Sequence, residues 1–217
     1  VTETATSFEN ERKKVEIRLV QSIEQNEHFG IGTNGEMKNI SFGLFAAEGI
    51  VSASGTSIPA NGLVEIISLN EDGTAKVKTD LPFGSYYVQE LATDSHYMLS
   101  DTKYPVTFEY AGQDTAVVKI NANDGKAIEN DLLYGSVSGK KVDEDGKVLA
   151  GAVIGLFRTD DGEFTKETAL MTATSKEDGS FSFEGIPYDT WYIREIEQPA
   201  GFVLDDTVYP VSIGKDA

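Results

Sequence analysis

The chain contains no cysteine, so neither disulfide bonds nor thiolate metal sites are available to it. Histidine is nearly absent as well. His28 and His96 share no ligand spacing with each other or with a pair of carboxylates, and we interpret both as surface loop residues. The sequence therefore predicts no metal site and no cofactor.

Basic residues and long apolar runs are also scarce. The chain has 18 Lys and Arg against 36 Asp and Glu, which gives a formal net charge of −18. Such an acidic surface repels the phosphates of nucleic acids and of anionic membranes. No apolar run approaches the ~20 residues needed to span a bilayer, and no signal peptide opens the chain. We expect no nucleic-acid partner and no membrane insertion of this segment.

The sequence is rich in short alternating runs of Val, Ile, Phe, Tyr and Thr, separated by Gly, Asp and Asn turns. This pattern is typical of an antiparallel β-sandwich, and no stretch shows the 3.6-residue period of a helix. The expected strands of the first half are Val15–Val20, Ser41–Ala46, Leu63–Ser68, Ala75–Thr79, Ser85–Glu90, Tyr104–Tyr110 and Thr115–Ile120. Those of the second half are Gly135–Lys141, Ala152–Arg158, Ala169–Thr174, Ser180–Phe183, Trp191–Glu195 and Val208–Ile213.

Several motifs of the first half recur in the second half. The matched pairs are Phe8–Arg12 with Ile128–Leu132, Ile40–Phe45 with Ala152–Phe157, Asn70–Gly73 with Lys176–Gly179, and Asp101–Val106 with Asp206–Val211. An internal repeat of this kind predicts two tandem domains. We expect residues 1–11 to be the closing strand of a preceding repeat and residues 12–130 to form domain 1 with a long insertion. Residues 131–217 should form domain 2, lacking its last strand.

One stretch in each half places a carboxylate among apolar side chains. Side chains two apart in a strand share a face, so Trp191, Ile193 and Glu195 point the same way. A charged group on an apolar face is costly unless it is neutralised or paired. The run Phe83–Glu90 repeats the pattern and ends on Glu90. A lone strand Glu is ordinarily solvent-facing or in a surface ion pair, but the repetition favours two buried carboxyl groups.

With the repeat in view, the sequence resembles the B-type repeat domains of Gram-positive surface adhesins and pilins (Cna B-type, SpaA-like, with a prealbumin-like fold). The resemblance is specific in Gly135–Gly146, Leu149–Phe157, Asp178–Pro187 and Trp191–Phe202. It is looser in the first half, where the insertion Ser22–Asn39 follows the first strand. It implies two tandem antiparallel β-sandwiches with little helix, serving as stalk domains of a cell-wall-anchored, extracellular protein. Such domains give mechanical and proteolytic stability and are not enzymes.

The resemblance also implies a covalent chemistry. In that family, a Lys of the first strand and an Asn or Asp of the last strand form an isopeptide bond with the help of a buried Glu. Carried over, it makes Lys141 the nucleophile and Glu195 the assisting carboxyl group. Desolvation favours a neutral amine and a protonated carboxyl, which the attack requires. The amide partner would lie beyond Ala217 or be Asn10 of another chain.

Domain 1 departs from that pattern. Counting from Asn10 the same eleven residues that separate Asn130 from Lys141 leads to Gln21, so no amine faces Glu90. We therefore expect no isopeptide bond in domain 1 and a vestigial, neutral Glu90 that is hydrogen-bonded to Gln21 and Asn130. Lys13 lies an even number of residues from Gln21, so in a strand the two side chains share a face, and Lys13 is an alternative nucleophile.

Two other functions remain open. The chain could be a ligand-binding adhesin module, with the insertion Ser22–Asn39 or the loop Ala47–Pro59 contacting a glycan or the extracellular matrix. It could also be an accessory β-sandwich of a secreted enzyme. The expected partners are neighbouring repeats of the same chain and a host matrix or glycan ligand held by other domains. A further expected partner is a second copy, whose Val1–Asn10 would complete domain 2 by strand exchange.

Overall fold

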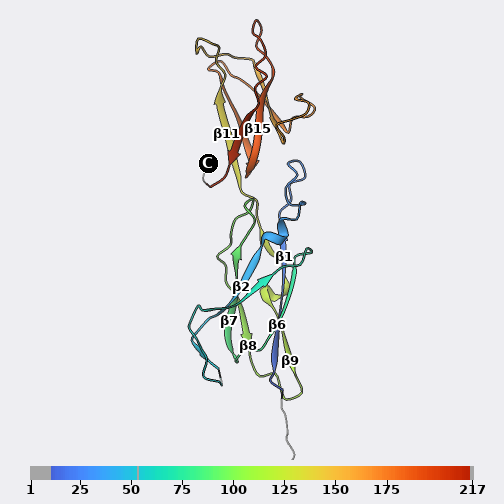
Figure 1. Ribbon diagram of the computed structural model, residues 1–217, viewed down its shortest axis with the longest axis vertical. Coiled ribbons are helices and arrows are strands. Elements are labelled where there is room, and N and C mark those ends of the chain that lie inside the picture. Colours follow the sequence, from blue (N-terminus) through green and yellow to red (C-terminus); the bar gives the residue numbers. More distant parts are fainter. Residues whose placement is uncertain (1–10, 53, 216–217) are drawn as a thin grey trace, which may run out of the picture. The chain divides into compact units, whose positions relative to one another are not determined.

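The computed structural model describes residues 11–52 and 54–215, and Figure 1 shows their strands. The regular elements there are strands β1 to β16 and two short 3₁₀ turns, η1 (Glu36–Asn39) and η2 (Ala122–Gly125). The predicted all-β fold with little helix is confirmed. None of the helical turns in the described part of the chain has the length or apolar character needed to cross a membrane.

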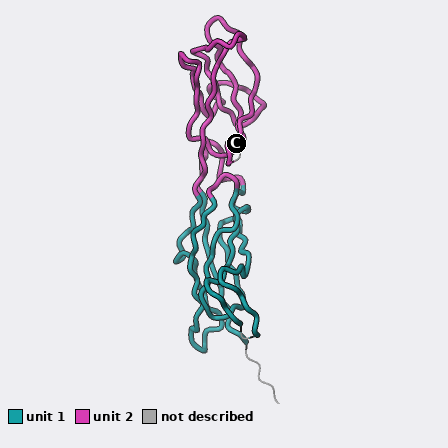
Figure 2. The backbone as a smooth tube through the Cα atoms, turned by 90° about the vertical axis from the view of Figure 1, so that its left-hand side faces the viewer, with its two compact units in different colours: residues 1–23, 35–94, 99–130 teal, residues 24–34, 95–98, 131–217 magenta. Residues whose placement is uncertain are grey.

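The chain divides into two compact units, which Figure 2 colours separately. Unit 1 contains the described residues up to 23 together with 35–94 and 99–130, and unit 2 contains 24–34, 95–98 and 131 onwards. The prediction gave the whole insertion to domain 1, whereas the structure assigns residues 24–34 of it to unit 2. The physical reason is burial: Phe29 and Ile31 of this segment are buried, and the Phe29 ring packs edge-on at 5.2 Å from the ring of Trp191.

The first sheet of unit 1 is organised around β1 (Lys14–Ile23). This strand pairs antiparallel with β6 (Thr74–Thr79) and parallel with β9 (Val117–Asn121) and β10 (Ile128–Asn130). Alternate apolar residues of β1 are buried in the core, as the period of two requires. The first and last strands of unit 1 therefore lie side by side and point the same way.

The second sheet of unit 1 covers the other side of the core. Its order is β5 (Leu63–Ser68), β2 (Ser41–Ala46), β7 (Gly84–Ala92) and β8 (Tyr104–Phe108), with the small hairpin β3 (Ile50–Val51) and β4 (Ser57–Ile58) beside it. Phe42, Leu44 and Val88 are fully buried in the core. This is the two-layer packing expected of a β-sandwich.

Unit 2 repeats the arrangement with fewer strands. One sheet pairs β11 (Tyr134–Lys140) with β14 (Ser180–Pro187). The other has the order β13 (Met171–Thr174), β12 (Val153–Phe157), β15 (Asp189–Glu197) and β16 (Tyr209–Ile213). Within the described residues β11 has one hydrogen-bonded neighbour, whereas its counterpart β1 has three. One long edge of β11 is therefore unpaired in this part of the chain.

A pair of glycines fixes the correspondence between the two units. Gly73 has φ +79° and its carbonyl accepts a 2.8 Å hydrogen bond from the amide of Gln21; Gly179 has φ +77° and accepts one of 2.8 Å from the amide of Lys141. A Cβ would stand 2.2 Å from Gln21 O at the first position and 2.7 Å from Lys141 O at the second. Because no side chain fits either place, both turns need glycine. Gln21 and Lys141 are structural counterparts.

Candidate functional site

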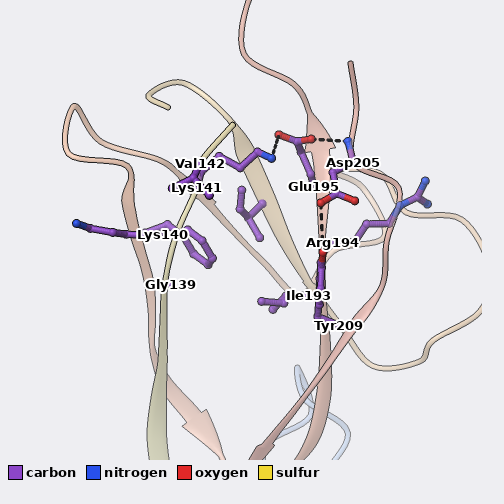
Figure 3. Close-up of a pocket in the computed structure, with 11 residues that line it drawn as sticks. Gly139, Lys140, Lys141, Val142, Ile193, Arg194, Glu195, Asp205 and Tyr209 are labelled. Carbon is purple, nitrogen blue, oxygen red and sulfur yellow. Dashed lines mark hydrogen bonds and ion pairs between the residues drawn. The ribbon is translucent and has the colours of Figure 1, made fainter. Parts of the chain in front are cut away.

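Unit 2 brings Lys141 and Glu195 together. Lys141 directly follows β11, and Glu195 lies on β15 opposite Ile154 of β12. The Lys141 Nζ is 3.7 Å from Glu195 Oε1, and Figure 3 shows the two side chains pointing toward one another. The side chains are 19% and 4% exposed, respectively. The predicted nucleophile and carboxyl thus form a largely buried pair.

The carboxyl group of Glu195 has one satisfied oxygen and one open oxygen. Oε2 accepts a 2.7 Å hydrogen bond from the backbone amide of Asp205. Oε1 is buried and has no hydrogen-bond partner among the described residues, because the distance to Lys141 Nζ is too long for a hydrogen bond. Buried polar atoms are nearly always satisfied, so this oxygen has room to accept a further donor.

A cavity of about 270 Å³ adjoins the pair. Ile154, Phe181 and Ile193 give it an apolar wall, and its charged lining residues are Lys141 and Glu195 together with Lys140, Arg194 and Asp205. The Phe181 ring lies so close over Gly139 that a Cβ there would be 2.5 Å from it. An apolar wall beside an amine and a carboxyl lowers their hydration, and lower hydration favours amine attack on an amide.

Unit 1 contains a buried glutamate held in the same way, by a backbone amide, and here an asparagine side chain also binds it. We call this set of donors around the glutamate the cradle. Glu90 on β7 is buried, and its Oε2 accepts 2.7 Å from the backbone amide of Ser100. Its Oε1 accepts 2.6 Å from Nδ2 of Asn130, which also donates to Thr93 Oγ1 at 2.9 Å. Burial raises the pKa of Glu90, and the hydrogen bonds from Ser100, Asn130 and Thr93 oppose that rise. The open oxygen of unit 2 corresponds to the oxygen that Asn130 occupies in unit 1.

The predicted hydrogen bond between Gln21 and Glu90 is wrong. Gln21 is buried, but its Nε2 donates at 2.7 Å to the carbonyl of the adjacent Ser22. Gln21 Oε1 and Asn130 Oδ1 are both buried without a partner among the described residues. Two carbonyl oxygens cannot hydrogen-bond each other, so Gln21 Oε1 does not supply the donor that Asn130 Oδ1 lacks.

Lys13, the alternative nucleophile, is engaged elsewhere. Its Nζ donates to the carbonyls of Gly112 and Thr115, the latter at 2.6 Å, and it stands 5.0 Å from the centre of the Tyr110 ring. These partners lie in the loop between β8 and β9, away from the Glu90 cradle. Among the described residues of unit 1, the Glu90 carboxyl and the Asn130 amide therefore have neither Lys13 nor a lysine at position 21 beside them.

The backbone amides of Ser100 and Asp205 are the members of the site that the residue pattern missed. Each lies ten residues beyond its glutamate and holds the same carboxylate oxygen, at 2.7 Å in both units. A backbone donor leaves no side-chain signature. The repeat alignment could have found it, because Asp101–Val106 and Asp206–Val211 follow directly after these residues.

The raised pKa of Glu90 predicts a pH dependence. Between its unfolded pKa near 4.5 and its raised folded pKa, the folded state binds more protons than the unfolded state. The unfolding free energy of unit 1 should therefore fall as pH rises through that window, and Glu90→Gln should remove this part of the slope. Urea unfolding followed through unit 1 amide signals in NMR, from pH 4 upwards, checks it. Parallel curves for the two proteins would contradict the assignment.

The geometry and a comparison with known families together define the class of protein. Both units are two-layer β-sandwiches of prealbumin-like type, each with a buried glutamate cradled by a backbone amide. The family model of the SpaA prealbumin-like fold domain matches residues 29–126 and 135–217. Since these matches cover most of the sequence, the chain belongs to the SpaA prealbumin-like fold family, and the resemblance stated from the sequence is confirmed.

One solved structure shows the same fold at low sequence identity. The Bacillus anthracis TIE protein matches with a TM-score of 0.60 and 17% identity over 93% of this chain, and the chain spans 32% of that structure's length. The C-terminal fragment of the pilus adhesin SpaC from Lactobacillus rhamnosus GG matches with a TM-score of 0.48 and 14% identity, covering 92% of this chain and 82% of that one. No match was found among curated proteins. At 17% identity the likeness to the Bacillus anthracis protein concerns the fold alone.

Proposed function

We propose that the chain is a structural stalk segment of an extracellular, cell-wall-anchored adhesin or pilin-like protein of a Gram-positive bacterium. The observation that best supports this proposal is the parallel pairing of β1 with β9 and β10. When the two ends of unit 1 are pulled apart, parallel terminal strands are loaded in shear. All their hydrogen bonds then resist together instead of opening one at a time. Membership of the SpaA prealbumin-like family supports the same role.

The covalent chemistry of the stalk is proposed for unit 2 alone. Lys141 first passes a proton to its ion-pair partner Glu195, and its amine then attacks the side-chain carbonyl carbon of an asparagine placed in the cavity. A C–N bond to Lys141 forms, the bond to the amide nitrogen breaks, and ammonia leaves. Glu195 accepts a hydrogen bond from the amide through its open Oε1 and transfers the proton from the amine to the leaving nitrogen. Each site reacts once, so the chain turns over no substrate and is not an enzyme.

The proposed source of that asparagine is Asn10 of a second copy. Its segment, Val1–Asn10, lies outside the described residues. The proposal is supported by the unpaired edge of β11 in unit 2, since the corresponding edge of β1 in unit 1 carries β9 and β10, and β10 ends at Asn130. An unpaired edge is a template for a strand from another chain.

Intact mass measured under denaturing conditions tests the chemistry. We expect covalent multimers in which each link is lighter by one ammonia, and monomers of unmodified mass because Gln21 stands where unit 2 has Lys141. Lys141→Arg should abolish the multimers, while the matched change Lys140→Arg at an exposed neighbour should leave them. Multimers that survive Lys141→Arg would contradict the mechanism. A monomer lighter by one ammonia would place a bond in unit 1, from Lys13 or Lys14 to Asn130.

A further inference from the structure

Unit 2 is closed at the start of β11 by a segment that precedes it in the sequence. Tyr97 forms an isolated antiparallel bridge with Leu132, flanked by backbone hydrogen bonds of 3.1 and 2.8 Å. Tyr97 is 1% exposed, and Leu132 is buried as well. Residues 95–98 thus lie beside residues 131–133 and are joined to them through this single bridge.

A glutamate fastens the same place. Glu24 Oε2 accepts 2.8 Å from the backbone amide of Leu132, and Oε1 accepts 2.8 Å from the hydroxyl of Tyr134. The Tyr97 hydroxyl donates to the carbonyl of Glu24 at 2.9 Å. The Tyr97–Leu132 bridge, the buried Tyr97 ring and the Glu24 carboxylate therefore act together at the start of β11, and we call this set of contacts the closure.

The internal repeat contains counterparts of the residues that form this closure. Aligning Glu90 with Glu195 makes Phe202 and Val203 the counterparts of Tyr97 and Met98. Phe202 is 42% exposed and Val203 is 92% exposed. An aromatic ring that is buried in one copy of the motif lies open in the other.

The counterpart of Glu24 is Glu144, which follows Lys141 at the distance at which Glu24 follows Gln21. Glu144 is exposed in the acidic turn Asp143–Asp145, where Asp143 Oδ1 accepts the amides of Asp145 and Lys147. Asp143 is thus used within the turn.

Unit 1 carries a matching receiving surface. The counterparts of residues 131–134 are 11–14, where Arg12 and Lys14 are exposed. Beside them lies a groove of about 700 Å³ lined by Arg12, Lys13 and the rings of Phe83 and Tyr110. Both rings are exposed. Asp80 also lines the groove and lies 3.8 Å from Arg12, which leaves Lys13 and Lys14 as the excess positive charge. In a chain of net charge −18, this excess complements the acidic turn of unit 2.

We propose that copies of this chain dock head to tail through these two surfaces. Residues 200–203 of one copy pair antiparallel with residues 11–13 of the next, Phe202 enters the groove beside Phe83, and Glu144 meets the Arg12 amide and the Lys14 side chain. The two surfaces differ, so the contact is heterologous and extends into a linear array. Its area is small, and tethering in tandem repeats would strengthen it. The inference is independent of the Lys141 chemistry.

Disulfide trapping tests the contact, because the chain has no cysteine of its own. Met98 N donates to Asp131 O in the existing closure, so their counterparts Val203 and Glu11 should face each other within disulfide reach. In a Lys141→Arg background, which prevents isopeptide links, Glu11→Cys with Val203→Cys should form the 11–203 disulfide about tenfold faster than a control pair. The control is Lys119→Cys with Val203→Cys, at an exposed residue of β9.

Two changes separate docking from random collision. Phe202→Ser in the trapping variant should reduce the rate to that of the control pair, and Glu144→Lys should slow it, most strongly at low salt. Peptide mapping identifies the disulfide formed. Equal rates for the two cysteine pairs, or trapping unaffected by Phe202→Ser, would overturn the proposal. Preferential 203–203 or 11–11 disulfides would replace it by a two-fold contact.

Discussion

Gln21→Lys is expected to create an isopeptide bond to Asn130 in unit 1. Gln21 stands opposite Ile128 in the parallel pairing of β1 and β10, and Asn130 lies two residues further along on the same face, about 7 Å up the strand. A lysine side chain can span that distance. Asn130 is already bonded to the buried Glu90 through its amide nitrogen, so carboxyl and amide are in place and only the amine is added.

The bond would show as an intact mass lighter by one ammonia. Closing a loop of ~100 residues stabilises a domain by about 4–5 kcal/mol in the chain-entropy treatment of cross-links, and urea unfolding followed through unit 1 amide signals measures the gain. Gln21→Met is the matched control, since it fills the site without an amine. Adding Glu90→Gln to Gln21→Lys should stop the reaction. A folded Gln21→Lys protein of unmodified mass would show that the cradle of unit 1 does not support the chemistry.

The pairing of Lys141 with Glu195 could be predicted because the family resemblance named the two roles, and strand parity and the repeat, which are local signals, assigned the residues. Trp191, Ile193 and Glu195 alternate on β15, and the eleven-residue spacing places Lys141 and Gln21 in corresponding positions. The structure explains why the spacing works: each residue donates its backbone amide to a left-handed glycine, Gly179 or Gly73. A turn that only glycine can form holds the register of both first strands.

Features that depend on tertiary packing could not be predicted from the sequence. Gln21 could donate to Glu90 or to a nearby carbonyl, and the carbonyl of Ser22 is its acceptor. Residues 24–34 follow β1 of unit 1 in the sequence, yet Phe29 packs on Trp191 and Arg158 Nη1 donates to the Phe29 carbonyl at 3.0 Å. Periodicity reports which face of a strand is apolar, but it does not report which domain an insertion will cover.

Lys141→Met is expected to destabilise unit 2 by about 3 kcal/mol. The change leaves Glu195 buried with no cation beside it, and breaking a buried ion pair costs about 3–5 kcal/mol. The lower end applies because the Lys141 side chain retains 19% exposure. Trp191 is fully buried in unit 2 and is the chain's single tryptophan, so urea unfolding of the monomer followed by its fluorescence reports on this unit alone. Lys140→Met at the exposed neighbour should change the stability by less than about 0.5 kcal/mol.

The double variant Lys141→Met with Glu195→Leu tests whether the ion pair serves the stability of unit 2 or its reactivity toward an amide. Replacing both charges by apolar groups removes their desolvation cost together with their attraction, so its stability should return to within about 1 kcal/mol of the unmodified chain. Recovery would mean that a lysine and a glutamate are not required there for folding, which leaves reactivity toward an amide as the role that needs them both. A double variant as unstable as Lys141→Met would instead mean that the pair stabilises the fold. If Lys140→Met and Lys141→Met destabilised unit 2 equally, the buried Glu195 would not depend on the Lys141 amine.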